Sequence, residues 1–332
     1  MKGKAVVFTD KLTVSVREVD LPEPRPDEVV VEPAVSWISK GTESSYLRGE
    51  RIAGDTASFE GGPTPFPIVP GYQKTGIVRE VGSEVAGLRT GDRVFASVSR
   101  VNGMFAPAGG HVSPAVTAAN QVWKLPEGAD FTDYSGLVLT QVGYNCGMKG
   151  NLAPGDRAVV LGDGLVGQWT AQTLLHRGVQ VLVAGRRDDR LNLLPAEAAR
   201  LNARRDSLPE AAGDFAGGGT GIAAVVDTVG DLEAVQRLLP LLRRGADFVS
   251  AGFYGTRGVI DIQHLRQKEI SLHAPSGWVR ERMDAALEGI RESWLQTGRL
   301  VTHRFPAGRA ADAWKLIADN KEPCLGVVLD WE

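Results

Sequence analysis

The chain has 332 residues, a length at which two domains are the ordinary expectation. Its hydrophobic content of 43% is that of a globular protein, and its net charge of −3 provides no basic surface for nucleic acid or for an anionic membrane. Because no apolar run approaches the roughly 18 residues of a membrane span and the N-terminus lacks the features of a signal peptide, we expect a cytoplasmic protein.

The two cysteines, Cys146 and Cys324, are far apart in the sequence. They cannot form a disulfide framework or a four-cysteine zinc site. We therefore expect both to be reduced and to serve as small apolar side chains.

Short β-rich segments separated by glycine and proline occupy the chain up to about residue 125. Each combines β-branched residues with turn signals at its ends. The clearest are residues 6–19, 28–38, 75–82 and 91–98. The pattern is typical of a small barrel-like β domain.

Apolar strands begin to alternate with helical segments near residue 134. Strands are expected at 157–164, 179–185, 223–230 and 246–255, and helices at 134–150, 165–178, 187–201 and 231–245. This alternation indicates a parallel sheet covered by helices on both faces. Towards the end we expect a strand at 269–275, a helix at 278–297 and a strand at 324–331 that returns to the first domain.

Three glycines, Gly162, Gly164 and Gly167, form a G-x-G-x-x-G motif between an expected strand and an expected helix, with Leu165 and Val166 inside it. The glycines allow a tight turn and close approach of the backbone to a pyrophosphate, and the helix N-terminus supplies N–H donors. A second strand ends about 20 residues further on, as the fingerprint requires. These five residues are therefore predicted to bind a dinucleotide.

In an NAD-binding unit, Asp or Glu usually ends that second strand and binds the ribose 2′-hydroxyl. Here the strand ends in Gly185, Arg186 and Arg187, which leave room for a 2′-phosphate and can donate charge-assisted hydrogen bonds to it. The sequence therefore predicts NADPH in preference to NADH. The alternative is that both arginines are solvated and that Asp188 binds the ribose.

Thr228, Gly252 and Phe253 follow two further expected strands. Ligands of open α/β sheets bind at the carboxyl edge of the strands, so these residues are predicted to line the nicotinamide half of the cofactor site. The alternative for Gly252 is that it only ends its strand.

These motifs and their order resemble the medium-chain dehydrogenase/reductase superfamily, to which the zinc alcohol dehydrogenases belong. The resemblance rests on residues 41–43, 69–76, 90–94, 109–128 and 152–167. It implies an α/β fold with a GroES-like β-barrel domain and a doubly wound parallel-sheet Rossmann domain. The expected divisions are 1–128 for the GroES-like substrate domain, 129–268 for the Rossmann domain and 269–332 for a return segment that completes the first domain.

Within the superfamily, the GTE turn at 41–43 together with the PGY at 70–72 resembles the bacteriochlorophyllide dehydrogenase-like branch. Similar dehydrogenases act on sugar or aminocyclitol intermediates of antibiotic pathways. Relatives commonly form homodimers by joining their Rossmann sheets, and the apolar segment 245–262 matches the joining edge. The resemblance thus implies a homodimer that acts on a small molecule and binds neither nucleic acid nor membrane.

Zinc-dependent members hold the catalytic metal with a Cys before the GT(D/E) turn, a His after it and a His-Glu pair after Pro-Gly. The matching positions here are Lys40, Ser45, Tyr72 and Gln73, which are poor zinc ligands. The loop that holds a structural zinc in the family contains no cysteine in this chain. The comparison therefore implies an enzyme without zinc at either site.

Without zinc, the charge that develops on a carbonyl oxygen during hydride transfer calls for a proton donor. Lys40 and Tyr72 occupy vacated ligand positions and are predicted to be catalytic, with Glu43 orienting Lys40 or holding a substrate hydroxyl. The alternatives are a solvated Lys40, a packed Tyr72 and a Glu43 that only braces the turn. The histidines share no ligand spacing and are expected to be structural.

The leading interpretation is NADPH-dependent reduction of a ketone to a secondary alcohol, or the reverse. The substrate would be a polar small molecule, such as a sugar or aminocyclitol intermediate of secondary metabolism. Reduction of a conjugated C=C bond, as in quinone and enoyl reductases, stays open, as does a non-catalytic NADPH-binding protein. The loop at 48–67, which contains Asp55 and Glu60, is expected to shape substrate specificity.

Overall fold

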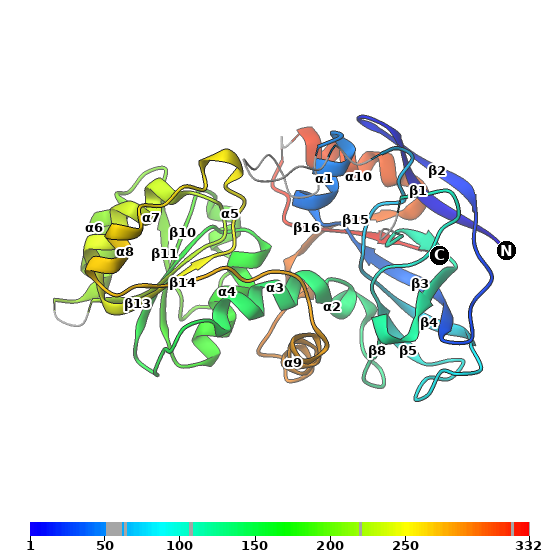
Figure 1. Cartoon of the computed structure of the whole chain (residues 1–332), viewed down its shortest axis with the longest axis horizontal. Helices are drawn as coiled ribbons and strands as arrows, with labels where there is room; N and C mark the ends of the chain where they lie inside the picture. Colours follow the sequence, from blue (N-terminus) through cyan, green and yellow to red (C-terminus); the bar gives the residue numbers. More distant parts are fainter. Residues whose placement is uncertain (51–61, 63–64, 106–108, 219–220, 320–321, 332) are drawn as a thin grey trace. The chain divides into compact units, whose positions relative to one another are not determined.

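A computed structural model describes residues 1–50, 62, 65–105, 109–218, 221–319 and 322–331 (Figure 1). Most of the loop at 48–67, including Asp55 and Glu60, lies outside these residues. The described part of the chain falls into two compact units. The first unit runs up to Val138 and resumes at Thr297, and the second unit is formed by Leu139–Gln296.

The first unit is built on two β-sheets. One sheet has the order β2-β1-β6, and the other has the order β15-β16-β3-β4-β5-β8, with β7 also paired to β3. Its strands are β1 (Lys2–Asp10), β2 (Thr13–Asp20), β3 (Glu28–Trp37), β4 (Lys74–Val81), β5 (Arg93–Ala96), β6 (Val112–Ser113), β7 (Ala115–Ala118), β8 (Val122–Lys124), β15 (Val301–Pro306) and β16 (Gly326–Asp330). Its helices are α1 (Lys40–Leu47), α2 (Phe131–Ser135) and α10 (Ala310–Asp319).

The core of the first unit is filled by β-branched and small residues on the inward faces of these strands. Val29 and Val31 of β3, with Val78 of β4 and Val94 of β5, belong to one buried cluster. The expected strand at 6–19 is a hairpin of β1 and β2, because Leu12 takes a positive φ of 57° and reverses the chain. The return of the chain after Thr297 adds β15 and β16 to the sheet beside β3.

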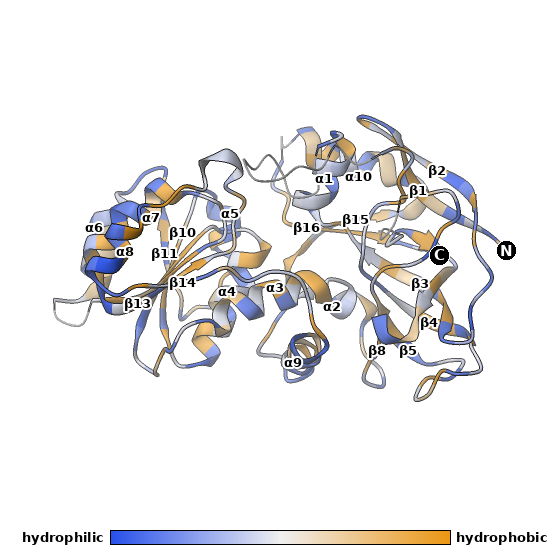
Figure 2. Cartoon of the chain, viewed as in Figure 1, coloured by the Kyte–Doolittle hydropathy of each residue, from blue (hydrophilic) through white to orange (hydrophobic). Residues whose placement is uncertain are grey.

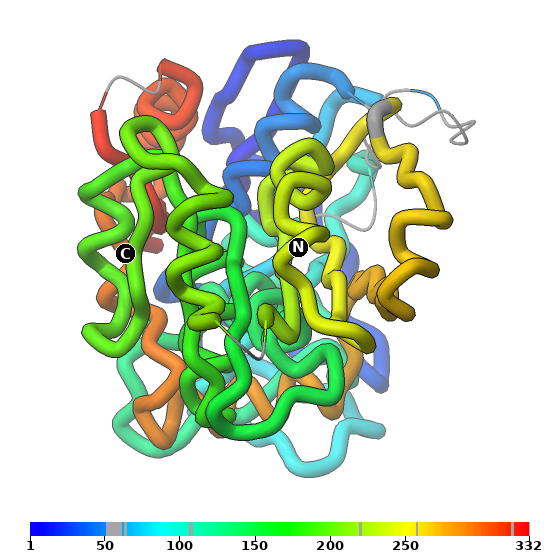
Figure 3. The backbone as a smooth tube through the Cα atoms, turned by 90° about the vertical axis from the view of Figure 1, so that its left-hand side faces the viewer, coloured from blue at the N-terminus to red at the C-terminus, as the bar shows by residue number. Residues whose placement is uncertain are grey.

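The second unit is a six-stranded parallel sheet of order β11-β10-β9-β12-β13-β14. Its strands are β9 (Arg157–Leu161), β10 (Gln180–Gly185), β11 (Ala199–Asn202), β12 (Ile222–Asp227), β13 (Leu242–Ser250) and β14 (Ser271–His273). Its helices are α4 (Leu165–His176), α5 (Asp188–Leu191), α6 (Leu208–Ala216), α7 (Leu232–Leu238), α8 (Ile262–Gln267) and α9 (Arg280–Arg291), and α3 (Leu137–Met148) begins at its boundary. Figure 3 follows the same strands and helices as a tube drawn from green through yellow to orange.

Alternating residues of the central strand β9 point into two different cores. Val159 and Leu161 pack with α6, α7 and α8, whereas Ala158 and Val160 pack with α3, α4 and α5. Figure 2 shows the strands of this sheet in hydrophobic colours and the helices α6, α7 and α8 in mixed colours. The sheet is therefore covered on both faces, which is the doubly wound arrangement expected from the sequence.

The helix expected at 187–201 is wrong. Only Asp188–Leu191 is helical, and Ala199–Asn202 forms the edge strand β11, paired in parallel with β10. Pro195 has no N–H for a helical hydrogen bond, and its ring clashes with the preceding turn. Leu201 can instead bury its side chain in the core beneath the sheet. The helix expected at 278–297 is shorter, since it ends at Arg291 and Ser293 takes a positive φ of 65°.

The sequence analysis set its divisions at residues 128 and 268, while packing divides the chain after Val138 and before Thr297. Cys146 of α3 is buried in the core of the second unit. At the other end, β14 extends the parallel sheet by pairing with β13. None of the helices in the described ranges is long and apolar enough to cross a membrane.

Candidate functional site

The loop between β9 and α4 has a conformation that two of its glycines require. Gly162 has a φ of +115°, and a Cβ there would lie 2.3 Å from Thr228 Oγ1. A Cβ on Gly167 would lie 2.0 Å from the Gly162 carbonyl oxygen. A Cβ on Gly164, the N-cap of α4, would meet no described atom within 4 Å. Steric exclusion therefore explains two glycines, and open space lies beside the third.

The start of α4 offers main-chain donors at this loop. Gln168 N–H makes the first helical bond, to the Gly164 carbonyl at 2.9 Å, so the N–H groups of Leu165, Val166 and Gly167 precede the helical bonding pattern. N–H groups in this position, at the positive end of the helix dipole, bind phosphate oxygens. The residues predicted to hold the pyrophosphate are thus gathered in one loop that fits it.

Thr228 lies beside this loop, at the carboxyl end of β12. Its hydroxyl donates to the Leu161 carbonyl at 2.8 Å, which joins the ends of β12 and β9. The turn that follows is held by Asp227, a buried carboxylate that accepts from the N–H groups of Val229, Gly230 and Asp231 at 2.8–2.9 Å. The sequence analysis missed this role of Asp227, although a carboxylate that ends a buried strand before a turn is a recognisable signal.

Gly252 and Phe253 follow β13 at the same edge of the sheet. A Cβ on Gly252 would lie 2.0 Å from the Gly230 nitrogen, so the two turns pack backbone against backbone. Phe253 is 68% exposed, which leaves a large apolar face open to a ligand or to solvent. The structure therefore brings Thr228, Gly252 and Phe253 to one edge, as expected for neighbouring parallel strands.

The end of β10 carries Arg186 and Arg187 to this edge as well. The Arg186 guanidinium is 65% exposed and lies 3.7 Å from an Asp231 carboxylate oxygen, and Arg187 Nε lies 3.2 Å from Asp189 Oδ1. Asp188, the alternative ribose ligand, accepts from Asn202 Nδ2 at 2.8 Å and from Arg205 at 2.9 Å. Two donors therefore already engage the Asp188 carboxylate.

In the first unit, the candidates Lys40 and Tyr72 lie on either side of Ser39. Lys40 Nζ donates to the Cys324 carbonyl at 2.7 Å and lies 3.9 Å from its Sγ. The Tyr72 hydroxyl donates to Ser39 Oγ at 2.6 Å. Burial raises the pKa of Tyr72, and the hydrogen bond with Ser39 opposes that rise only in part. The phenol therefore keeps its proton at neutral pH, as a proton donor must.

Glu43 is fully buried beneath these residues. Its Oε1 accepts from the Ser39 N–H at 2.7 Å, and its Oε2 lies 2.9 Å from His111 Nε2. His111 is also fully buried, and its Nδ1 hydrogen-bonds with Ser36 Oγ at 2.7 Å. Such contacts brace the start of α1 and leave the Glu43 carboxylate no exposure through which to touch a substrate.

His111 contacts all the segments that carry the candidate catalytic residues. A Cβ on Gly71, the residue before Tyr72, would lie 2.7 Å from its ring. The ring also meets Trp314 of α10 edge-on, with centroids 5.4 Å apart. Sequence reasoning assigned the histidines no role in the site, because Glu43 and His111 are 68 positions apart and no local pattern shows their contact.

The side chains at the positions that match zinc ligands make hydrogen bonds within the protein. Gln73 is fully buried and its Nε2 donates to the Trp37 carbonyl at 3.4 Å, while Ser45 Oγ donates to the Gly41 carbonyl at 3.2 Å. Across the part of the chain that the structure describes, no three His, Cys, Asp or Glu side chains gather in a way that could hold a metal ion. The chemistry of these side chains therefore does not fit a zinc ion.

A lysine that the sequence analysis passed over, Lys74, is fully buried in the first unit. Its Nζ donates to the Ser97 carbonyl at 2.7 Å and to the Gly109 carbonyl at 3.1 Å. Burial lowers its pKa to about 7. Lys74 thus ties β4 to the segment that leads into His111.

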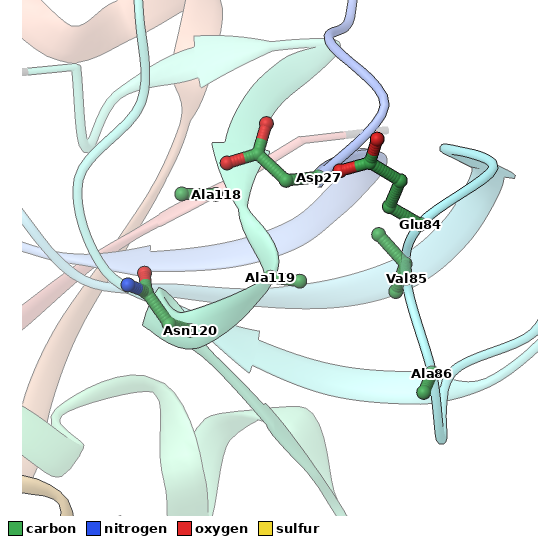
Figure 4. A pocket seen from close by; sticks show the side chains of 7 residues that line it. All are labelled: Asp27, Glu84, Val85, Ala86, Ala118, Ala119 and Asn120. Carbon is green, nitrogen blue, oxygen red and sulfur yellow. The ribbon is translucent and has the colours of Figure 1, made fainter.

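A surface hollow of about 270 Å³ lies elsewhere on the first unit (Figure 4). It is lined by Asp27, Glu84, Val85, Ala86, Ala118, Ala119 and Asn120. None of these is a candidate residue, so the hollow takes no part in the predicted chemistry.

Comparison with known proteins agrees with this architecture. The Alcohol dehydrogenase GroES-like domain family matches residues 27–127. The whole chain is 28% identical to the 2-desacetyl-2-hydroxyethyl bacteriochlorophyllide A dehydrogenase of Cereibacter sphaeroides, over 345 residues and 99% of that protein. Together with the two sheets, this confirms the predicted fold, a GroES-like domain joined to a doubly wound Rossmann domain.

Two solved structures share the fold over nearly their full length. One is described as a short chain alcohol dehydrogenase from Escherichia coli CFT073 complexed with NADH, with a TM-score of 0.84, 23% identity and 99% of each chain covered. The other is described as a putative zinc-binding dehydrogenase from Sinorhizobium meliloti 1021 bound to NADP, with a TM-score of 0.81, 20% identity and 100% of each chain covered. The same fold thus accepts either nicotinamide cofactor.

Proposed function

From the premise that the chain belongs to the alcohol dehydrogenase-like medium-chain dehydrogenase/reductase superfamily, we propose an NADPH-dependent dehydrogenase/reductase that uses no zinc. Membership makes the protein an oxidoreductase acting on CH–OH groups. The reaction we propose interconverts a ketone and a secondary alcohol on a polar small molecule.

The observation that carries the choice of NADPH is the turn after β10. Arg186 and Arg187 stand where an NAD-specific site presents a carboxylate, and Gly185 itself carries no side chain that could bind a free ribose hydroxyl. Asn202 and Arg205 both donate to Asp188 Oδ1, so they compete with a ribose hydroxyl for that oxygen. The exposed guanidinium of Arg186 and the partly buried guanidinium of Arg187 favour a dianionic 2′-phosphate at this turn.

When bound, NADPH supplies the hydride of the reaction. The residues of this chain then bind its phosphates, orient the substrate and manage one proton. Tyr72 is a protonated phenol held toward Ser39, and Lys40 is a cation held at the Cys324 carbonyl. Either can donate to a substrate oxygen, and Glu43 positions them by bracing the helix start between them.

The names of the relatives support the proposed substrate class. The bacteriochlorophyllide dehydrogenase named above acts, by its name, on a hydroxyethyl group, and other relatives are named as a putative D-xylulose reductase and a D-arabitol-phosphate dehydrogenase. A secondary alcohol on a polar, hydroxylated molecule is common to these chemistries. We propose a sugar or aminocyclitol intermediate of secondary metabolism as the substrate.

Cofactor and substrate class are tested together by steady-state kinetics. We expect kcat/KM to favour NADPH over NADH by about tenfold to a few hundredfold, on the order of 1.4–3.5 kcal/mol. Arg186→Ala and Arg187→Ala should reduce this preference without changing the affinity for NADH. Equal values for the two cofactors in the wild-type protein would contradict the choice of NADPH.

A panel of hydroxylated ketones and of conjugated enones separates the reactions. Turnover of ketones supports carbonyl chemistry, while turnover of enones alone would show a C=C reductase. Tight NADPH binding with turnover of neither class would identify a non-catalytic binding protein.

We also propose that the protein is a homodimer. The sequence placed the joining edge at residues 245–262, but β13 in that segment is covered by β14, so the proposed joining edge is β14. Leu272 on that strand is 46% exposed, and the nearby Val259 and Ile262 are 81% and 59% exposed. An uncovered apolar edge of a sheet favours pairing with a second copy. Light scattering at micromolar concentration should give the mass of a dimer, and Leu272→Lys should shift it toward the monomer. A wild-type monomer would contradict this assembly.

A further inference from the structure

Asp163, the second residue of the glycine motif, buries its carboxylate against the end of β10. Oδ2 accepts hydrogen bonds from the N–H groups of Arg186 at 2.7 Å and of Arg187 at 2.9 Å. Oδ1 lies 3.6 Å from Arg190 Nη1, and the side chain is only 9% exposed. Both oxygens are thus engaged by groups of the β10–α5 turn.

The same carboxylate accounts for the glycine that ends β10. A Cβ on Gly185 would lie 2.5 Å from both Asp163 Cβ and Asp163 Oδ2. Contacts this short are not tolerated, so position 185 cannot carry the strand-end carboxylate that binds a free ribose hydroxyl unless Asp163 moves. The pyrophosphate loop and the ribose-binding turn are therefore coupled through one side chain.

We propose that Asp163 is the positioning residue for NADPH selectivity: its carboxylate holds the main chain of Arg186 and Arg187 so that their guanidinium groups face the adenosine 2′-phosphate. This inference rests on the proposed function, because it requires a cofactor with a 2′-phosphate. Asp163 acts through the turn and makes no contact with the phosphate. A carboxylate that touched the phosphate would repel it.

The direction in which Asp163→Ala changes NADPH affinity distinguishes a positioning role from a purely electrostatic one. Removing a carboxylate beside two arginines makes the turn more positive, which by charge alone strengthens binding of the 2′-phosphate. Releasing the main chain of the same arginines weakens binding, because they must be ordered again when the phosphate arrives. Asp163→Ala should therefore weaken NADPH binding despite the gain in positive charge.

Asp189 provides the matched control. It carries the same charge and also contacts Arg187, but its Oδ1 meets the guanidinium Nε at 3.2 Å and not the main chain. Asp189→Ala should leave NADPH affinity unchanged or raise it. Asp163→Asn keeps an oxygen that can accept from the two N–H groups, so its effect should lie between those of the wild type and Asp163→Ala.

The measurement is the dissociation constant of NADPH and of NADH for the purified full chain, by calorimetry or nicotinamide fluorescence. The readout is the ratio of the NADH constant to the NADPH constant, because damage to the shared pyrophosphate site cancels in it. We expect Asp163→Ala to lower this ratio at least about tenfold. Adenosine 2′,5′-bisphosphate, which lacks the pyrophosphate and the nicotinamide, should lose affinity in parallel.

The outcomes distinguish the two proposals. A wild-type ratio near one overturns the NADPH preference, and this inference with it. A high wild-type ratio that survives in both Asp163→Ala and Asp163→Asn overturns the role of Asp163 alone. If Asp163→Ala does not fold, Asp163→Asn decides. A lowered ratio in that variant supports positioning, and a ratio that is not lowered contradicts it.

Discussion

The two units hold their candidate residues by different physical means. In the second unit, the glycine loop predicted to hold a pyrophosphate is defined by main-chain groups and by the absence of side chains at Gly162 and Gly167. In the first unit, the candidates are defined by side-chain hydrogen bonds, in which Glu43 and His111 form a fully buried pair. The site in the second unit is therefore determined by backbone conformation, and the site in the first unit by contacts between side chains.

This difference decides how well a function carries over between distant relatives. A backbone site lies in consecutive residues, so a motif preserves it as a block. A side-chain network depends on residues far apart in sequence, and a change at one position alters the role of the others. The local motif therefore supports cofactor binding directly. The identity of the proton donor depends on the side-chain network and has to be determined by experiment.

The largest effects should come from the candidate proton donors. Lys40→Ala and Tyr72→Phe are each expected to lower kcat by about 10²-fold or more, the usual contribution of a positioned acid. NADPH affinity should stay within about twofold, since neither residue lies in the pyrophosphate loop. Stopped-flow turnover and cofactor titration measure the two effects separately.

Ser45→Ala is the control for this pair, because the Ser45 hydroxyl has local contacts: it donates to the Gly41 carbonyl at 3.2 Å and accepts from Arg48 Nη2 at 3.4 Å. It should leave kcat unchanged. Wild-type kcat in both Lys40→Ala and Tyr72→Phe would mean that water or a substrate hydroxyl supplies the proton.

The next largest effects should come from Gly→Ala substitutions in the loop of the second unit, where the backbone defines the site. Gly167→Ala places a Cβ 2.0 Å from the Gly162 carbonyl oxygen. The substitution should lower the free energy of unfolding by about 2–3 kcal/mol and should also weaken cofactor binding. Gly164→Ala meets no described atom, so it should weaken NADPH binding with an unchanged Tm, by filling the space that a phosphate needs.

Thermal melts with and without NADPH separate these cases. Gly213→Ala in α6, which also meets nothing within 4 Å, is the control and should raise stability by about 0.5–1 kcal/mol. A normal Tm in Gly167→Ala would show that the loop rearranges without penalty.

What the sequence could predict follows the same division. The strands, the glycine loop and the edge that gathers Thr228 and Gly252 follow from local patterns and from the rule that parallel strands end together. The strand β11 escaped prediction because its pairing with β10 is set by the sheet and not by its own residues, of which Ala and Arg favour a helix.

The partners of the candidate residues escaped prediction for a related reason. His111 reaches Glu43 across 68 residues, and Asp163 reaches Arg186 across 23. No local pattern records such contacts. Asp163 lies inside the glycine motif, between Gly162 and Gly164. The motif specifies the glycines and leaves the residue between them unspecified, so it does not predict a role for Asp163.

A smaller effect concerns Lys74 and pH. Its pKa is about 7 in the folded protein and 10.5 when unfolded, so between these values the unfolded chain binds the extra proton and stability rises with pH. The slope should approach, at most, about 1.4 kcal/mol per pH unit. Burial raises the pKa of Cys146 from 9.0 to about 12, which offsets the Lys74 trend between pH 9 and pH 10.5 and makes stability fall with pH above 10.5.

Lys74→Met should flatten the rise between pH 7 and pH 9 in urea unfolding. Lys4→Met, at an exposed lysine of β1, should keep it. A slope that persists in Lys74→Met would assign it to other groups.

The last prediction is that removal of metal ions has no effect on activity. Incubation with a strong chelator should leave kcat unchanged, because Lys40, Ser45, Tyr72 and Gln73 stand at the zinc-ligand positions and are poor ligands. Elemental analysis of the purified protein provides the independent check. Zinc near one equivalent, together with activity lost on chelation, would contradict this expectation and restore a metal to the first unit.

The buried contact between Glu43 and His111 has a consequence for the history of the family. Removing one partner of a buried ionisable pair leaves an uncompensated polar group and costs about 3–5 kcal/mol, whereas exchanging both for packed apolar residues can be nearly neutral. A lineage therefore crosses between the two states most easily when both positions change close together. Among related chains, an acidic residue at position 43 and a histidine at position 111 should be inherited, and lost, as a pair.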